Sequence, residues 1–108
     1  MAIDWNQIFQ GAVDAAVNTS KASEAKLRGY LKDIQAQHEA ALVDITKAYA
    51  TGGIDKATFE SSLEDEMETL RNELSAMTVV AKAAAQRAAN AFVEALTSAL
   101  KTAVFAAI

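Results

Sequence analysis

The stretch that decides the fold is Thr51-Gly52-Gly53-Ile54-Asp55-Lys56-Ala57-Thr58-Phe59. Glycine is favoured just past a helix end, because it adopts the left-handed conformation without a Cβ clash. After the two glycines, Asp55 is a natural N-cap, and Ile54 and Phe59 have the spacing of a hydrophobic staple. One helix therefore ends at a turn over residues 51–54, and a second helix begins at Asp55.

The start of the chain repeats these signals in the stretch Ile3-Asp4-Trp5-Asn6-Gln7-Ile8. Asp4 has the position of an N-cap, and Gln7 that of its capping-box partner. Two helix starts and one stop predict two helices, over about 4–51 and about 55–107. Each helix would be ~70 Å long.

The amino-acid composition favours long helices and argues against several classes of function. The 108 residues include 25 alanines and no proline, which favours a single all-α domain. Without cysteine there is no disulfide framework and no cysteine-ligated metal site. The formal net charge of −4 argues against nucleic acid as the main partner.

Apolar residues recur at alternating steps of three and four along both predicted helices, which is the spacing of a coiled-coil seam. A Gly-Gly turn between two such helices predicts a long antiparallel two-helix hairpin. The residues assigned to the hairpin seam are Leu27, Leu31, Ile34, His38, Ile45, Phe59, Leu63, Leu70, Leu74 and Met77.

Charge blocks support the antiparallel pairing. Residues 21–54 carry a net charge of +1 and would face residues 55–74, which carry −5. Complementary blocks select the direction of pairing more than they add stability. With the turn at the two glycines, this register places His38 near Glu68.

One segment weakens the prediction of a continuous first helix. Asn18, Thr19 and Ser20 are three poor helix formers in a row. A break near residues 18–20 would give a three-helix arrangement instead of a hairpin, and this alternative stays open.

A stripe of small residues lies nearly opposite the seam on the first predicted helix. Alanine alone would be explained as a good helix former at exposed positions. An exposed glycine, however, costs roughly 1 kcal/mol against alanine, so the glycines favour a face that another helix approaches closely. The stripe consists of Gly11, Ala15, Asn18, Ala22, Ala25, Gly29, Ala36 and Ala40.

The residues after 75 are apolar around most of the second predicted helix, and residues 1–20 bring further apolar side chains to the same end of the hairpin. A helix that is apolar on several sides needs more than one neighbour. We therefore expect two or more hairpins to associate into a four-helix bundle or a larger assembly. The expected oligomer interface comprises Trp5, Phe9, Val13, Val17, Phe92, Leu96, Leu100, Val104 and Phe105.

Few residues suggest a catalytic or metal-binding role. His38 is the single imidazole, and a ferritin-like metal site would want glutamate three positions before it, where Gln35 stands. His38 is therefore interpreted as a seam residue paired with a carboxylate. The acidic run from Glu60 to Glu68 suits the first half of a helix, where acids favour the helix dipole. The sequence has neither a phosphate-binding loop nor a serine nucleophile motif. We expect a non-enzymatic protein without cofactor, with metal binding as the third alternative.

No targeting signal is evident in the sequence. The first basic residue is Lys21, so the N-terminus lacks the positive region of a signal peptide. Charges interrupt the apolar stretch 75–108, which falls short of the ~20 apolar residues of a spanning helix. The default expectation is a soluble cytoplasmic protein, and secretion without a cleaved signal stays open.

In length and layout the chain resembles the small secreted helical hairpins named for a Trp-x-Gly turn. The resemblance implies two antiparallel helices that dimerise. The turn here, Tyr49-Ala50-Thr51-Gly52-Gly53, has no tryptophan, so no function is carried over. We expect a self-assembling structural or adaptor protein that binds itself or other helical proteins through apolar, alanine-rich faces. The alternative is a small secreted or membrane-interacting effector.

Overall fold

The computed structural model describes residues 3–21 and 24–107. Within these ranges the chain forms four α-helices and no strand: α1 (Trp5–Ser20), α2 (Glu24–Ala50), α3 (Lys56–Ser75) and α4 (Lys82–Ala107). The prediction of an all-α protein is confirmed. The prediction of two uninterrupted helices over 4–51 and 55–107 is wrong, because each of the two segments is broken once.

The first break follows α1. Lys21 adopts the left-handed conformation, with a φ of 58°, and caps the helix. Ser20 Oγ donates a hydrogen bond to the carbonyl oxygen of Val17 at 3.2 Å, and Arg87 of α4 donates one to the carbonyl oxygen of Ser20 at 3.0 Å. The segment 18–20 therefore closes α1, which places the break directly after the position that the three-helix alternative gives it.

The second break, over residues 76–81, separates α3 from α4. The amide of Ala76 points at the carbonyl oxygens of residues 72–74 and ends α3. Thr78, Val79 and Val80 follow, and three β-branched residues in a row lose rotamer freedom in a helix. Met77 is buried and holds this loop to the core. The predicted two-helix hairpin and the three-helix alternative therefore both have fewer helices than the structure.

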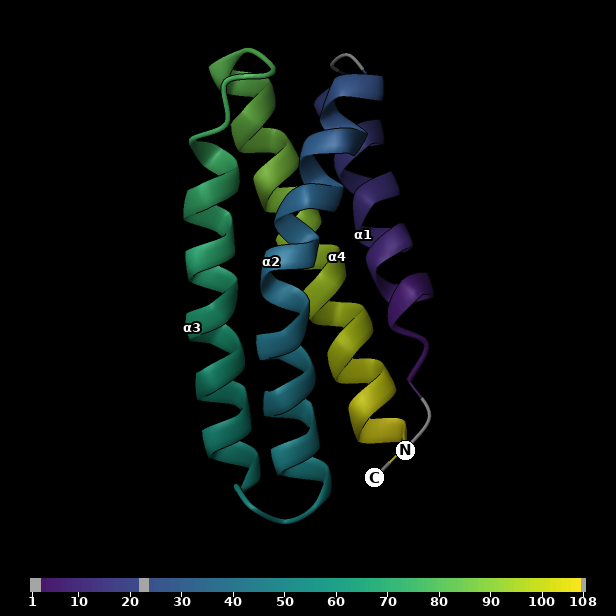
Figure 1. The fold of residues 1–108 in the computed structure, drawn as a ribbon, viewed down its shortest axis with the longest axis vertical. Coiled ribbons are helices and arrows are strands. Elements are labelled where there is room, and N and C mark those ends of the chain that lie inside the picture. The colour runs from purple at the N-terminus through teal and green to yellow at the C-terminus, as the bar shows by residue number, and fades with distance from the viewer. Residues whose placement is uncertain (1–2, 22–23, 108) are drawn as a thin grey trace.

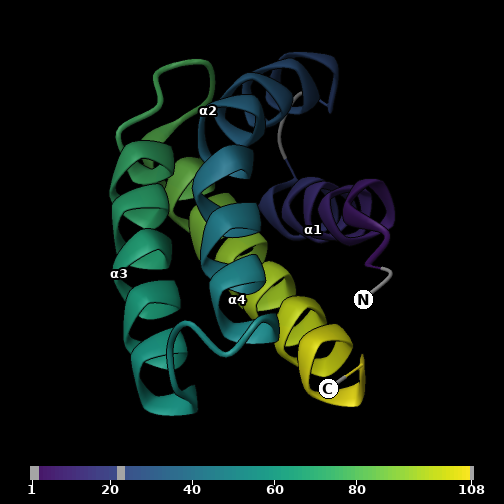
Figure 2. The same ribbon diagram turned by 60° about the horizontal axis from the view of Figure 1, so that its bottom comes forward.

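Helices α2 and α3 form an antiparallel hairpin, while α1 lies beside α2 and α4 runs obliquely behind it (Figure 1). Figure 2 shows the tilt of α4 against α3, so that the two helices diverge toward the end of α4. The most extensive contact between helices is that of α1 with α4, followed by α3 with α4. The start of α1 and the end of α4 lie toward the same end of the molecule as the α2–α3 turn (Figure 1).

The buried apolar side chains of the described residues form one cluster between the helices. Each helix contributes side chains that are almost completely buried, among them Phe9 of α1, Leu31 of α2, Phe59 of α3 and Phe92 of α4. Burying a side chain of this size stabilises a fold by about 1.5–3 kcal/mol. The four helices, within 42 × 22 × 18 Å, thus cover the apolar faces of one another.

Two aspartates start helices at the positions that the sequence suggests. Asp4 accepts a hydrogen bond from the amide of Gln7 at 3.0 Å, and Asp55 accepts one from the amide of Thr58 at 2.8 Å. The backbone hydrogen bond from Thr58 holds the pKa of the Asp55 carboxyl below its usual range. Each carboxylate satisfies an amide that has no partner within its helix.

The geometry of the α2–α3 turn favours glycine at both positions. Gly52 has a φ of 80°, which a residue with a Cβ adopts only under strain. A Cβ on Gly53 would lie 3.3 Å from the carbonyl oxygen of Ala48, which accepts the amide hydrogen bond of Gly53 at 2.8 Å. The turn thus fixes where α2 stops and lets α3 return along it.

Candidate functional site

Most residues of the expected oligomer interface are buried within the chain. Trp5 is partly buried against the core, and Phe105 is 36% exposed. The other seven residues are buried in the core, to which α1 and α4 contribute: Phe9, Val13, Val17, Phe92, Leu96, Leu100 and Val104. The helix that covers these side chains belongs to the same chain, so in this fold they do not form a surface for a second one.

The hairpin seam is largely interior. Ile45 is partly buried, and the other nine assigned residues are buried: Leu27, Leu31, Ile34, His38, Phe59, Leu63, Leu70, Leu74 and Met77. Leu42 and Met67 are also buried, although the predicted seam does not include them. An α-helix has about 3.6 residues per turn, so a strict heptad drifts by one position along a long helix.

His38 on α2 is buried and contacts two carboxylates of α3. Its Nδ1 lies 2.6 Å from Oε1 of Glu66, and its Nε2 lies 2.9 Å from Oε2 of Glu73. The two glutamates are one heptad apart on α3, and the imidazole lies between them. The sequence predicts a carboxylate partner for His38, but the partner that it names, Glu68, is wrong.

The two contacts favour the protonated form of His38. A neutral imidazole donates one hydrogen bond, so its second nitrogen would turn a lone pair toward an anionic oxygen. Burial alone would lower the pKa of His38, but hydrogen bonds and charge from Glu66 and Glu73 outweigh burial and raise this pKa above its ordinary value. The imidazolium form donates at both nitrogens and ties α2 to α3 as a bridge of two ion pairs.

The described part of the chain contains no group of three or more His, Cys, Asp or Glu side chains placed to hold a metal ion. Both nitrogens of His38, which are the atoms a metal would need, already face carboxylate oxygens. Each ring nitrogen of His38 is thus paired with a carboxylate oxygen of α3.

An aromatic cluster joins three helix ends beside the α2–α3 turn. The rings of Tyr49 and Phe59 stack with centroids 4.8 Å apart, and Phe105 meets Phe59 edge-on at 5.9 Å. Nζ of Lys56 lies 4.8 Å from the centroid of the Phe105 ring. Phe105 therefore ties the end of α4 to the hairpin, which sequence spacing did not predict.

The stripe of small residues, in contrast, stays mostly on the surface. Ala15 is partly buried, and Ala22 lies outside the described residues. A Cβ built on Gly11 or on Gly29 meets no atom within 4 Å, so packing inside the chain requires neither glycine. The exposed members of the stripe are Gly11, Asn18, Ala25, Gly29, Ala36 and Ala40.

Two lysines flank this stripe on α2. Successive residues of a helix are rotated by ~100°, so Lys26 and Lys32 project about 60° to either side of Gly29. Both lysines are exposed, and within the described residues neither forms an ion pair. Asp33, also exposed, projects about 40° from Gly29, so the face carries charges of both signs. We define the α2 face as the surface that consists of Ala25, Lys26, Gly29, Lys32, Asp33, Ala36 and Ala40.

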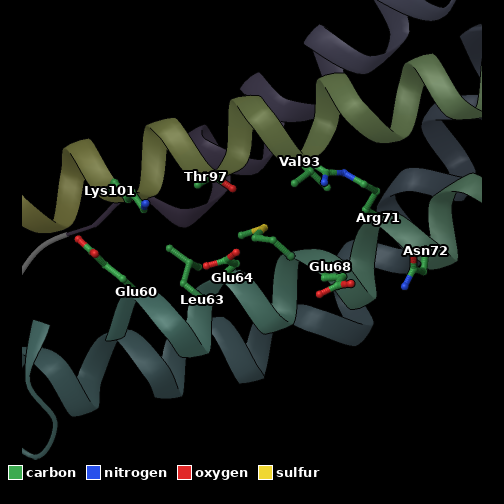
Figure 3. A pocket seen from close by; sticks show the side chains of 10 residues that line it. Glu60, Leu63, Glu64, Glu68, Arg71, Asn72, Val93, Thr97 and Lys101 are labelled. Carbon is green, nitrogen blue, oxygen red and sulfur yellow. The ribbon is translucent and has the colours of Figure 1, made fainter. Parts of the chain in front are cut away.

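A groove of about 570 Å³ opens between α3 and α4, where the two helices diverge. Glu60, Glu64 and Glu68 follow one another along its α3 side, and Thr97 and Lys101 lie on its α4 side (Figure 3). The remaining lining is formed by Leu63, Met67, Arg71, Asn72 and Val93. Three of these, Leu63, Met67 and Val93, are nearly buried and form an apolar floor.

The groove is lined by three acidic and two basic side chains. Its three glutamates stand four residues apart, a spacing at which like charges destabilise a helix by a few tenths of a kcal/mol per pair. In Figure 3, Lys101 lies opposite Glu60 at one end, and Arg71 reaches toward α4 beside Val93 at the other. Within the described residues, none of these charged side chains forms an ion pair.

A second, shallower opening of about 440 Å³ lies between α1 and α4. It is lined by Gln7, Ile8, Gly11, Ala12, Ala95 and Ala99. No charged side chain lines it, so it offers close approach to a partner but no electrostatic selection.

Comparison with known protein families, curated proteins and solved structures finds no match to this chain. In the part of the chain that the structure describes, no helix combines the length and the apolarity needed to cross a membrane.

Proposed function

We propose that this protein is a non-enzymatic, helical structural or adaptor protein that associates with further copies of itself. The observation that carries the proposal is Gly29. It stands in the interior of α2, is exposed, and has open space where a Cβ would be. Alanine would fit there and would favour the helix by roughly 1 kcal/mol. The fold of one chain therefore gives no reason for a glycine at this position.

A second helix would supply the reason. Glycine permits close approach of another backbone. Ala25, Ala36 and Ala40 continue the line of small side chains, over ~22 Å of α2. Contact through such side chains buries little apolar area, so we expect weak association, with a dissociation constant on the order of micromolar or higher. The proposed contact uses the stripe of small residues and leaves the core residues in place.

The membrane-interacting alternative has less support. It depends on a wide apolar face of the C-terminal helix, and Phe92, Leu96 and Leu100 of that face are completely buried. Among the described residues, Val79 and Phe105 are the large apolar side chains with more than a third of their surface exposed. They lie near opposite ends of α4 and form no continuous patch.

The use of the titratable groups supports the non-enzymatic part of the proposal. His38, Glu66 and Glu73 pair with one another between α2 and α3. Glu64 and Glu68 are both exposed on one side of α3.

The proposal is tested by sedimentation equilibrium over a range of protein concentrations. The wild-type chain should associate, and Gly29→Ala should associate more weakly, because its Cβ keeps the second backbone further from α2. Gly29→Gln should remain monomeric, because its side chain holds a second helix away. Ala83→Gln, an equal enlargement at an exposed position of α4, is the matched control and should associate like the wild type. A wild-type chain that is monomeric at every concentration would refute self-association.

A further inference from the structure

We propose that the proton of His38 controls whether the second half of α3 stays packed on α2. With the proton, the contacts of His38 with Glu66 and Glu73 hold the two helices together, and without it this part of α3 separates from α2. We call these two contacts the His38 link. The link lies within one chain, so it does not depend on the proposed self-association.

The place of His38 in the seam between α2 and α3 is the first reason. The distances of 2.6 Å to Glu66 and 2.9 Å to Glu73 join α2 to two successive heptads of α3. Within the described residues, no other side-chain hydrogen bond or ion pair connects these two helices. Ile34, one turn before His38, and Leu70, between the two glutamates, are buried and apolar. One titratable side chain therefore makes the polar contact across an apolar seam.

The charges around His38 are the second reason. On α3, the groups that face the imidazole are the carboxylates of Glu66 and Glu73. On α2, the residues one turn before and after His38 do not titrate: Ile34, Gln35, Ala41 and Leu42. Within the described residues, no charged side chain of α1 or α4 pairs with His38. The two cations of α3 point elsewhere, Lys56 to an aromatic ring of α4 and Arg71 toward α4 in Figure 3, so neither takes the place of the imidazolium.

Loss of the proton to solvent makes one of the two contacts repulsive. A neutral imidazole keeps a hydrogen at one nitrogen and presents a lone pair at the other. The glutamate that faces the lone pair loses its donor, and both carboxylates then share the seam without a positive charge between them. Carboxylates that are partly buried without a partner are costly, and separation of α3 from α2 returns them to water.

The position of α3 is the third reason. This helix lies at the edge of the bundle, on the side away from α1 (Figure 2), and the groove of about 570 Å³ separates part of it from α4. The other helices are joined by contacts that do not involve His38. Arg87 of α4 donates to the carbonyl oxygen of Ser20 in α1 at 3.0 Å, and Arg28 of α2 pairs with Asp14 of α1 at 2.8 Å. Movement of α3 therefore leaves α1, α2 and α4 together.

The contacts at the α2–α3 turn limit the opening to the second half of α3. There the rings of Tyr49 and Phe59 stack at 4.8 Å, and the amide of Gly53 donates to the carbonyl oxygen of Ala48 at 2.8 Å. These contacts hold the start of α3 to α2 in either protonation state. The segment expected to separate is therefore residues 66–75. A detached helix shorter than ~12–15 residues is marginally stable in water, so the amides of this segment then exchange with solvent.

Hydrogen exchange of dilute protein, followed by NMR from about pH 6 to about pH 9, measures this opening. The rates are expressed as protection relative to an unstructured chain at the same pH. The pKa of His38 is raised in the closed state, so protection of residues 66–75 should be greatest below about pH 6.5 and fall as pH rises through the folded pKa. The fall should be tenfold for each unit of the pKa difference, with the midpoint of the His38 ring titration. Protection of α1 and α4 should stay unchanged.

Three variants complete the experiment. His38→Gln removes the titrating group, and Glu66→Gln/Glu73→Gln removes the charges that act on it, so either variant should make protection of residues 66–75 independent of pH. The second variant decides the question if the first does not fold. Glu64→Gln removes an exposed carboxylate of α3 that does not contact His38, and it should keep the wild-type response. Wild-type protection that does not change with pH, or that falls equally in all four helices, would overturn the proposal.

Discussion

Nδ1 of His38 on α2 and Oε1 of Glu66 on α3 lie 2.6 Å apart, the shorter of two contacts that the imidazole makes with α3. The second contact, to Glu73, occupies the other ring nitrogen. An imidazole between two carboxylates joins the helices most strongly when it carries a proton. The hairpin thus contains a titratable link, and its strength depends on pH.

The stability of the fold should fall as pH rises above neutrality. The folded pKa of His38 is raised, so the folded chain keeps a proton that the unfolded chain releases. The stabilisation is fully present below the unfolded pKa of about 6.5 and is lost as pH rises through the folded pKa. Urea unfolding should give a smaller free energy of unfolding at about pH 9 than at about pH 6. In His38→Gln this difference should shrink; an equal difference in both proteins would contradict the prediction.

The two glutamates should contribute unequally to the pKa of His38. Glu66 is the closer partner, and its side chain is 23% exposed against 40% for Glu73. Less solvent means less screening, so Glu66→Gln should lower the pKa of His38 more than Glu73→Gln. The chain has one histidine, so a proton NMR titration of its ring reports this pKa without ambiguity. Equal shifts, or a larger shift for Glu73→Gln, would show that distance and burial do not set the ranking.

The glycines should divide into two classes. A Cβ on Gly11 meets nothing within 4 Å and the residue is helical, so Gly11→Ala should raise the free energy of unfolding by roughly 0.5–1 kcal/mol. Gly52 has a φ of 80°, so Gly52→Ala should lower it by about 1 kcal/mol. Both changes are measured by urea denaturation of dilute protein. A destabilising Gly11→Ala would mean that this position is not open in solution.

Two residues of the expected oligomer interface should respond differently to truncation. Leu96 is completely buried, so Leu96→Ala should cost about 2–5 kcal/mol of stability in the monomer. Phe105 is 36% exposed and packs on the aromatic cluster at one side, so Phe105→Ala should cost less than Leu96→Ala. Denaturation at several protein concentrations makes the comparison. A Leu96→Ala cost that appears only at high concentration would place this side chain between chains instead.

The α2–α3 turn and the start of α3 could be predicted because their signals are local. Asp55 caps the next amides of its own helix, and Gly52 needs no distant partner to adopt its φ. The end of α1 was harder to predict, since the residues Asn18 to Ser20 only lower the helix propensity of their segment. The loop 76–81 has neither glycine nor proline, and its one local sign is the run of β-branched residues Thr78, Val79 and Val80.

The partners of α1 and α4 could not be predicted by the same means. Apolar spacing tells which side of a helix avoids water, but not which helix covers it. Val13 and Leu100 were therefore assigned to an interface between chains, although both are buried within one. The groove was also beyond sequence reasoning. The run from Glu60 to Glu68 is visible, but the opening beside it depends on the tilt of α4.

The interruptions at Lys21 and at residues 76–81 determine how many chains complete the core. Because the chain reverses direction at both, α1 and α4 reach the hairpin from within the same molecule. If continuous helix replaced either interruption, the same buried side chains would project from a long rod, and only another molecule could cover them. Monomeric folding and domain swapping thus share one set of contacts and differ in the connecting backbone alone. The backbone conformation of these two connecting segments therefore determines whether one chain or two complete the core. The core side chains themselves are compatible with monomeric folding and with domain swapping.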